Sequence, residues 1–468
     1  MTAREYHDLT KHSYESVRRN PHSLDWANQP LGFKIYPTLE PIPLPREFSA
    51  TATERLRLED LARLLYFSAG ITKRRAYPGG EILFRAAACT GALYEIELYV
   101  VCGGAPSMPD LPAGVYHFGP GDFALRRLRE GDFRGAVAGA PAAPLLLIAS
   151  GTYWRNAWKY QARTYRHFGW DNGTIHANLL AVAAALGLEA RLCCGFVDEQ
   201  VNRLLGLDTD REVALTVLAL GTSASPPAPP EAPPIHFETV PLSKQEVDYP
   251  AMREMHQASS LGSLEEVVAW RGELPTARPR AESLPGEPIE QVILRRGSTR
   301  RFARHPITLT ELRTILDQAA AGGGFLADFA KLNELYLIVN AVEGLEAGAY
   351  FHHAAGGALE PLALGDFRRL AAHLGLDQDL PGDAAAAVFF LADLNHVLGR
   401  YGNRGYRAVQ LEAGILGGRM YLAAYAQRLG ATGLTFYDDD VTGFFSPHAA
   451  GKSAIFLMAI GHPARRKP

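Results

Sequence analysis

The sequence has few cysteines, and they are not arranged as metal ligands. Its 468 residues include four, namely Cys89, Cys102, Cys193 and Cys194. Their spacing is not that of a zinc site, and adjacent cysteines such as the last two rarely form a disulfide with each other. This usage is typical of a protein in a reducing compartment. The sequence therefore predicts neither a disulfide framework nor a metal site.

Long hydrophobic runs and clusters of one charge are also absent. The apolar stretches NLLAVAAALGL and AAAAVFFLADL have the length of a buried helix or strand and are too short to cross a membrane. The net charge is −3, and no run of Lys and Arg suggests binding to nucleic acid or to a membrane surface. The polar start, MTAREYHDLTKHS, does not resemble a signal peptide. We therefore expect a soluble, cytoplasmic protein.

What the sequence does contain is a copy of itself. The segment YRHFGWDNGTIHANLLAVAAALGLEARLCCGFVDEQV, from Tyr165, is matched by YRAVQLEAGILGGRMYLAAYAQRLGATGLTFYDDDV, from Tyr406. Upstream, AGVYHF and a later GDFR correspond to AGAYFH and a later GDFR. The matching segments lie about 240 residues apart, which is the size of a domain and predicts a duplicated domain instead of a solenoid. Duplication turns an interface between two subunits into one within a single chain.

The repeat predicts two domains joined by a spacer. The first is expected over 1–221 and the second over 288–468. The segment 222–287 begins with the Pro-rich stretch TSASPPAPPEAPP, expected to be an extended spacer, and its part from about 237 to 287 is expected to wrap one domain onto the other. Within each copy, helical and strand-like segments follow one another without a regular βαβ order, which favours the α+β class. No G-x-G-x-x-G motif follows a strand, so a Rossmann fold is disfavoured.

The clearest local motif is ILRRGSTRRF, near the start of the second copy. Arg296, Ser298 and Arg300 alternate, so an extended backbone would place their side chains on one side. Two guanidinium groups and a hydroxyl suit a phosphate, because Arg supplies paired charged donors. Arg465 and Arg466, at the end of the same copy, are predicted to close the same pocket. The alternative is a solvated basic segment without a ligand.

Together, the motifs of both copies resemble the nitroreductase superfamily, and more narrowly its SagB-type dehydrogenases. The first copy carries YHDLTKHS, LDWANQPLGFKIY, GALYEIELYV, AGVYHF and KYQARTYR, and the second carries RYGNRGYR and ATGLTFYDDDV. The resemblance covers the whole chain except the Pro-rich spacer. It implies two nitroreductase-like domains that form a pseudo-dimer within one chain, with FMN as cofactor and an oxidoreductase activity.

In that superfamily, one subunit holds the FMN phosphate with R-x-S-x-R, and its partner places a loop of the pattern P-S-x-G-A-L-Y-P-x-E beside the flavin ring. The resemblance implies that the ring-binding loop here is 88–95. It has Ala-Cys in place of Pro-Ser and Glu95 in place of the second Pro, but backbone N–H groups can still bond to the flavin. The residues implied in contacts with the ring are Cys89, Thr90, Gly91, Ala92, Leu93 and Tyr94, with Gly433 and Leu434 covering its face.

The two copies have lost complementary parts of this site. The second copy has AGGGFLADFAKLNELYLIV where the loop pattern is expected, and the first copy has only the partial phosphate motif Lys11-His12-Ser13. We therefore expect one composite site, with the phosphate on the second copy and the ring on the first. The other pseudo-symmetric site is expected to be empty.

Lys159 and Tyr160 begin the segment KYQARTYR. The resemblance implies that this pair is the base in the dehydrogenation of peptide azolines, removing a proton as hydride leaves for flavin N5. A partly desolvated Lys can serve as a base. Gln161 replaces the family's Gly, and the second copy has Arg400-Tyr401, in which Arg cannot act as a base. The alternative is that the pair lies on a helix surface without a chemical role.

The function implied by the resemblance is therefore the FMN-dependent oxidation of an azoline-like or peptide-derived substrate. Two alternatives remain: an NAD(P)H-dependent reductase of nitro compounds or quinones, and a flavin-free interaction module, which the altered loop would favour. No nucleic-acid or membrane partner is expected, and further association of chains is left open. Asp438-Asp439-Asp440 is expected to start a helix and not to bind a metal.

Overall fold

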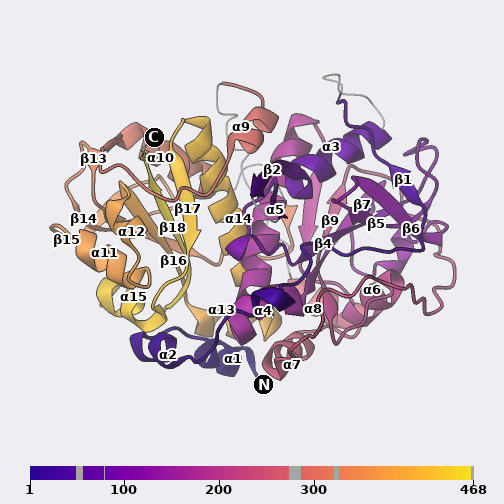
Figure 1. Ribbon diagram of the computed structural model, residues 1–468, viewed down its shortest axis with the longest axis horizontal. Helices are drawn as coiled ribbons and strands as arrows, with labels where there is room; N and C mark the ends of the chain where they lie inside the picture. The colour runs from indigo at the N-terminus through magenta and orange to yellow at the C-terminus, as the bar shows by residue number, and fades with distance from the viewer. Residues whose placement is uncertain (49–55, 78–79, 273–285, 321–325, 465–468) are drawn as a thin grey trace. The chain divides into compact units, whose positions relative to one another are not determined.

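The computed structural model describes residues 1–48, 56–77, 80–272, 286–320 and 326–464. The chain divides into two compact units (Figure 1). Unit 1 comprises Leu24–Arg278 with Met1 and Gly324–Ala330, and unit 2 comprises Thr2–Ser23, Pro279–Gly323 and Lys331–Pro468. The start of the chain therefore belongs to the unit that contains the second copy of the repeat.

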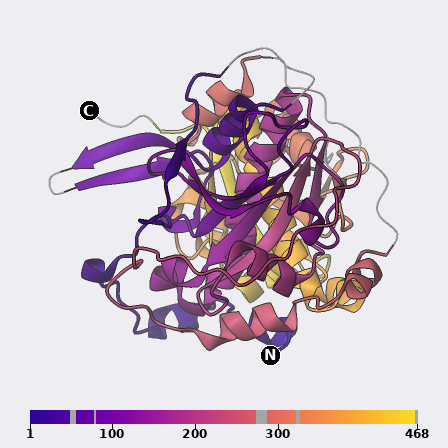
Figure 2. The same cartoon turned by 90° about the vertical axis from the view of Figure 1, so that its right-hand side faces the viewer.

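Unit 1 is built on an eight-stranded sheet of order β1-β6-β5-β4-β7-β9-β8-β11. Neighbouring strands are antiparallel except for β8 and β11. The central strands β4, β7 and β9 are buried along their whole length, which explains their nearly continuous apolar sequences. Strands β2 and β3 form a separate hairpin that projects from the unit (Figure 2). The strands are β1 (Pro41–Pro43), β2 (Ile71–Tyr77), β3 (Gly80–Arg85), β4 (Ile96–Cys102), β5 (Gly114–Gly119), β6 (Ala124–Glu130), β7 (Leu145–Thr152), β8 (Ala190–Cys193), β9 (Glu212–Leu220) and β11 (Leu326–Ala327).

Unit 1 has a long central helix, α5, which is buried on nearly every side and packs against α3, α4 and β4. A helix buried all round needs no polar face, so its sequence lacks a clear amphipathic pattern. Within the described parts of the chain, no helix combines the length and apolar character needed to cross a bilayer. The helices are α3 (Leu58–Ala69), α4 (Tyr153–Tyr160), α5 (Thr164–Ala185), α6 (Asp198–Leu205), α7 (Pro250–Ala258) and α8 (Leu264–Arg271), with the 3-10 turns η1 (Trp26–Asn28), η2 (Thr90–Ala92), η3 (Arg134–Ala136) and η4 (Gln161–Arg163).

Unit 2 has a six-stranded antiparallel sheet of order β15-β14-β12-β16-β18-β17, and a short parallel pair, β10 and β13. Its strands are β10 (Ile307–Thr308), β12 (Glu334–Val339), β13 (Val342–Glu343), β14 (Gly348–His352), β15 (Leu359–Leu364), β16 (Ala386–Ala392), β17 (Gly430–Leu434) and β18 (Ser453–Gly461). Its helices are α1 (Ala3–Leu9), α2 (Tyr14–Arg19), α9 (Ile289–Arg295), α10 (Leu309–Ala320), α11 (Arg368–Leu374), α12 (Asp379–Asp383), α13 (Leu394–Tyr401), α14 (Arg404–Ala426) and α15 (Asp438–Phe445). Asp438-Asp439-Asp440 is thus the first turn of α15.

The two sheets share one strand order and the same irregularities. The series β6-β5-β4-β7-β9-β8 corresponds strand by strand to β15-β14-β12-β16-β18-β17. A β-bulge needs an extra residue at a defined place, so bulges at equivalent positions indicate a common origin. The predicted α+β class and the duplication are confirmed. The equivalent register shifts lie between Val115/Tyr116 and Ala349/Tyr350, and between Ala149/Ser150 and Phe390/Leu391.

Helices α4 and α13, equivalent in the repeat, end in the same unusual backbone conformation. Gln161 has φ +51° and ψ −141°, and Gly402 has φ +55° and ψ −160°. Glycine dominates this region because a Cβ atom clashes there with the backbone. Gln161 is therefore strained where the second copy keeps glycine. Its side chain hydrogen-bonds to Tyr249, which opposes the cost.

We expect Gln161→Gly to raise the free energy of unfolding by about 1 kcal/mol or more when it is made in a Tyr249→Phe background, where the opposing hydrogen bond is already lost. Gly402→Ala should lower the free energy of unfolding by a similar amount. Both are measured by denaturant titration. A loss of stability on Gln161→Gly in that background would refute the strain at this position.

Candidate functional site

The loop predicted to contact the flavin ring connects β3 to β4 in unit 1. Gly91, Ala92 and Tyr94 have φ values of +65°, +54° and +56°. Only glycine adopts such angles freely, so the surroundings must hold the other two in place. Arg155 Nη1 donates to the carbonyl oxygen of Tyr94 at 2.8 Å, and the backbone N–H of Arg85 donates to the Tyr94 hydroxyl at 3.1 Å. The loop is thus tied to both α4 and β3.

The central helix α5 holds the start of this loop. The Asp171 carboxylate accepts the backbone N–H of Thr90, at 2.9 and 3.0 Å from its two oxygens, and the Thr90 hydroxyl at 3.0 Å. Three residues further along, the Thr174 hydroxyl donates to the carbonyl oxygen of Ala88 at 2.6 Å. One buried helix therefore fixes the loop backbone through two side chains on the same face.

Unit 2 uses the same interaction with different residues. Glu412 of α14, equivalent to Asp171 in the repeat, accepts the backbone N–H groups of Leu332 at 2.8 Å and Asn333 at 2.7 Å. These two residues lead into β12, the counterpart of β4. A carboxylate on the central helix thus pins the loop before the same strand in both copies.

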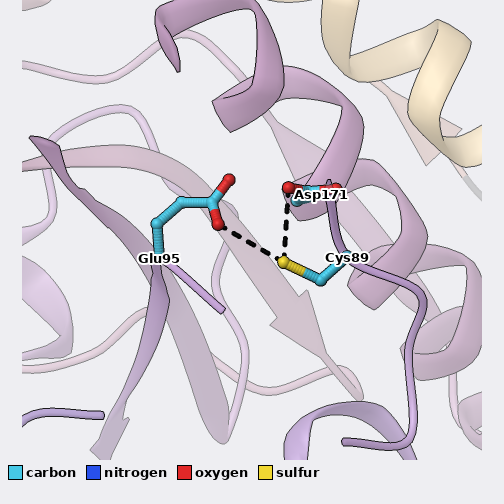
Figure 3. A group of neighbouring side chains, drawn as sticks. All are labelled: Cys89, Glu95 and Asp171. Atoms are coloured by element: carbon cyan, nitrogen blue, oxygen red, sulfur yellow. Dashed lines mark hydrogen bonds between the residues drawn. The ribbon is translucent and has the colours of Figure 1, made fainter. Parts of the chain in front are cut away.

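Cys89, Glu95 and Asp171 form a cluster at the base of the loop (Figure 3). Cys89 Sγ lies 3.3 Å from Glu95 Oε2 and 3.4 Å from Asp171 Oδ2. Burial, together with the charges of Asp171 and Glu95, raises the pKa of the Cys89 thiol well above its usual value. Burial and the neighbouring Glu95 likewise raise the pKa of Asp171. Two differences from the family loop, Cys89 for Ser and Glu95 for Pro, are therefore in contact with each other.

Tyr160, from the predicted base pair, reaches the same loop. A Cβ atom placed on Gly91 would lie 2.9 Å from the Tyr160 hydroxyl, so only glycine fits beneath it. Lys159 Nζ lies 5.3 Å from the centre of the Tyr160 ring, and both residues are half-buried. The second copy has the equivalent arrangement, with Arg400 at 4.6 Å from the Tyr401 ring. Unit 1 thus brings the predicted base pair and the predicted ring loop together.

In unit 2, Tyr421 of α14 connects the R-x-S-x-R segment to β17. Its hydroxyl lies 3.3 Å from Ser298 Oγ and accepts the backbone N–H of Gly433 at 2.6 Å. The Arg296 guanidinium lies 5.6 Å from the centre of the Tyr421 ring, which is within the range of a cation–π interaction. The equivalent residue of the first copy is Leu180, which offers no hydroxyl. Sequence reasoning missed Tyr421, and only this comparison of the aligned copies could have revealed it.

The remaining residues predicted to contact the phosphate or the ring differ in their surroundings. Arg300 is exposed, and Leu434 packs against a small apolar cluster that contains Phe302. Arg465 and Arg466 lie outside the described residues. The proposed roles of these residues remain predictions.

A buried network of charges lies behind the ring loop. Arg155 Nη1 is 2.7 Å from Glu97 Oε1, and Glu97 Oε2 is 3.0 Å from His117 Nε2. Burial alone would raise the pKa of Glu97, but Arg155 and the hydrogen bond from His117 hold it well below its ordinary value. A second pair, Lys34 with Glu212, lies beside it. No sequence motif indicates these pairs, because their members come from distant segments.

Comparison with known proteins identifies the family. The Nitroreductase family model matches residues 122–222 and 293–462, which together make up more than half of the chain. The chain belongs to the nitroreductase family. A crystal structure of a nitroreductase homologue from Anabaena variabilis superposes with a TM-score of 0.82 and 28% sequence identity, over 99% of both chains.

Two curated relatives of this nitroreductase-family chain are named as processing proteins. The trifolitoxin-processing protein TfxB of Rhizobium leguminosarum is 28% identical over 193 residues, covering 39% of this chain and 49% of TfxB. The microcin B17-processing protein McbC of Escherichia coli is 29% identical over 162 residues, covering 32% and 54% respectively. The chain thus matches about half the length of each. These matches confirm the predicted resemblance to nitroreductase-type proteins of the SagB kind.

Removing one member of the buried Arg155–Glu97 ion pair should destabilise the fold. Arg155→Met leaves the Glu97 carboxylate without its cationic partner, and we expect the free energy of unfolding to fall by about 3–5 kcal/mol. Adding Glu97→Gln should recover part of this loss, because no unpaired charge then remains. Denaturant titration of the two single variants and the double variant measures the coupling. Additive losses would show that the two side chains do not stabilise each other.

The raised pKa of Asp171 has a defined effect on stability. The folded protein holds this proton more tightly than the unfolded chain, so the contribution of Asp171 to stability is largest below about pH 4 and falls as the pH rises towards the raised value. Asp171→Asn cannot ionise and should show a weaker fall. Unfolding is measured across this range with a chelator present, because a metal ion bound to the cluster of Cys89, Glu95 and Asp171 would displace the proton from Asp171.

Asp122→Asn provides a control of opposite sign. Burial opposes ionisation of Asp122, but the hydrogen bond from Arg126 lowers its pKa overall, so its contribution is present above about pH 4 and lost as the pH falls. An Asp171→Asn variant with the same pH dependence as the parent protein would contradict the predicted role of Asp171.

Proposed function

We propose that this nitroreductase-family oxidoreductase uses FMN to oxidise an azoline-like or peptide-derived substrate by hydride transfer to flavin N5. The observation that carries the proposal is the contact between Tyr160 and Gly91, which places the Lys159-Tyr160 pair against the loop expected beside the flavin ring. The names of TfxB and McbC, which process trifolitoxin and microcin B17, favour a peptide-derived substrate.

The loop residues fit a flavin ring. The backbone N–H groups of Thr90, Ala92, Leu93 and Tyr94 already donate to Asp171, to carbonyl oxygens within the loop and to Cys89 Sγ. Among 90–94 this leaves the N–H of Gly91 as the donor for the ring. The positive φ of Gly91 and the absence of a side chain allow close approach of a flat ligand.

The phosphate is proposed to bind to the second copy. Arg296 and Ser298 flank the Tyr421 ring, and Arg300 is exposed and able to reach a ligand. Two guanidinium groups supply charged donors to a phosphate, and Ser298 supplies a neutral one. Because each copy retains one part of the motif, we propose one FMN per chain.

FMN, when bound, supplies the hydride acceptor. The chain's own residues would orient the substrate and manage its proton. Lys159, next to the Tyr160 ring and half-buried, is proposed to take a proton from the substrate carbon that is oxidised. Tyr160 would hold Lys159 near the loop through its own packing on Gly91.

The purified chain should carry one FMN, detected by its absorption between about 300 and 550 nm and by the mass of the released chromophore. Arg296→Ala with Arg300→Ala should abolish flavin binding, because the phosphate loses both charged donors. Arg301→Ala, an exposed arginine next to the motif, is the matched control and should retain flavin. Two FMN per chain would refute the single site, and no flavin after soaking with FMN would favour an interaction module.

Lys159→Ala should lower the turnover of a thiazoline- or oxazoline-containing peptide by about 100-fold or more while FMN remains bound. Arg400→Ala, the equivalent change in the second copy, is the matched control and should have little effect on the rate. Turnover is followed by mass spectrometry as a loss of two hydrogens. Equal rates for Lys159→Ala and the parent protein would exclude Lys159 as the base.

The second candidate function is reduction of nitro compounds or quinones with NAD(P)H. The likeness of the chain to the nitroreductase homologue from Anabaena variabilis, over 99% of both chains, favours it. Oxidation of NAD(P)H that depends on a nitroarene or quinone, without turnover of azoline peptides, would select this alternative.

A further inference from the structure

We propose that Cys89, Glu95 and Asp171 bind a divalent metal ion of the zinc class at the base of the ring loop. Cysteine spacing did not suggest this site, because its ligands come from a loop and from the distant helix α5. The cluster offers one sulfur and two carboxylate groups, whose donor atoms all lie within 4.8 Å of one another (Figure 3). Zinc binds this combination of thiolate and carboxylate ligands.

The two sulfur–oxygen separations of the cluster match those of a tetrahedral site. Zinc–sulfur and zinc–oxygen bonds of about 2.3 and 2.0 Å, at the tetrahedral angle, place sulfur and oxygen about 3.5 Å apart. In the cluster, Cys89 Sγ lies 3.3 and 3.4 Å from the nearest oxygens of Glu95 and Asp171. A metal ion could therefore bind with small side-chain movements.

The acidic groups of the cluster also favour binding of a cation. Glu95 is 0% exposed, and its Oε1 accepts no hydrogen bond from the described residues. Among the described residues, Glu95 and Asp171 hydrogen-bond to each other and to Cys89, and neither is paired with Lys, Arg or His. Two such buried acids are costly without a cation or a shared proton. A thiolate and two carboxylates carry three negative charges, which a divalent ion and the nearby buried Arg85 would neutralise.

The surrounding donors orient the ligands as they do in metal sites. The backbone N–H of Tyr94 donates to Cys89 Sγ at 3.0 Å, and the backbone and hydroxyl of Thr90 donate to Asp171. Hydrogen bonds of this kind fix the direction of ligand atoms and tune their affinity for metal. A cavity of about 10 Å³, lined by Arg85, Cys89 and Asp171 among others, leaves room for about one water molecule as a fourth ligand.

A bound ion would strengthen the connection between the loop and α5. The second copy makes this connection with Glu412, which accepts two backbone N–H groups without a sulfur ligand nearby. In the first copy the shorter Asp171 binds the backbone of only one loop residue, Thr90, and the metal would strengthen its contacts with Cys89 and Glu95. Without a metal, burial and the neighbouring acids raise the pKa values of Cys89 and Asp171, which favours protons in the place of the ion.

The test uses the full chain, with metal and FMN counted in the same sample, so that either can be absent without the other. Elemental analysis should find about one zinc-class ion per chain. After removal by a chelator, Co²⁺ should restore one equivalent and produce a thiolate charge-transfer band in the near-ultraviolet difference spectrum. Binding should release protons, so affinity should rise with pH.

Three variants decide whether the cluster is the site. Cys89→Ser should lose the charge-transfer band, and Glu95→Gln, which preserves shape, should bind Co²⁺ about tenfold or more weakly. Glu81→Gln, on the projecting hairpin, is the control and should bind as the parent protein does. A folded chain that neither contains metal as purified nor gives the Co²⁺ band would overturn the proposal and leave a cluster of shared protons. Equal binding by Cys89→Ser, Glu95→Gln and the parent protein would also overturn it.

Discussion

A carboxylate on the central helix organises each unit of this protein. In unit 1 Asp171 binds the backbone and side chain of Thr90, and in unit 2 Glu412 binds the backbone of Leu332 and Asn333. Both helices are almost wholly buried, so a carboxylate without these donors would be strongly destabilised. The loop must therefore stay against its helix, and in unit 1 this fixes the position of Gly91 beneath Tyr160.

The sequence predicted the fold well because the signals for it are repeated and local. Buried strands read as apolar runs, and the two copies give the same order of elements twice. The site was harder to predict because its members are distant in sequence and change chemically between the copies. Asp171 corresponds to Glu412 and Tyr421 to Leu180, so a search for identical residues passes over both pairs. The ring loop has no physical signal of its own in the sequence and is recognisable only by the family pattern.

Divergence of the two copies has affected side chains far more than the backbone. The register shifts of the sheets are retained at equivalent positions, and so is the left-handed conformation after α4 and α13. At that turn the first copy keeps the conformation although it has replaced glycine by Gln161. The fold therefore imposes the backbone, and each copy accommodates its own side chains within it.

The joining of two copies in one chain has a consequence for how such a protein can change. In a homodimer, every substitution appears in both subunits and alters both symmetric sites at once. A fused repeat is free of this restriction, so Cys89 and Glu95 could arise by substitution in the loop of the first copy while the equivalent loop of the second copy acquired different residues. A reactive or metal-binding group that would be harmful at both sites can thus be acquired at one site alone. Gene fusion therefore allows the two halves of an enzyme to evolve different sites.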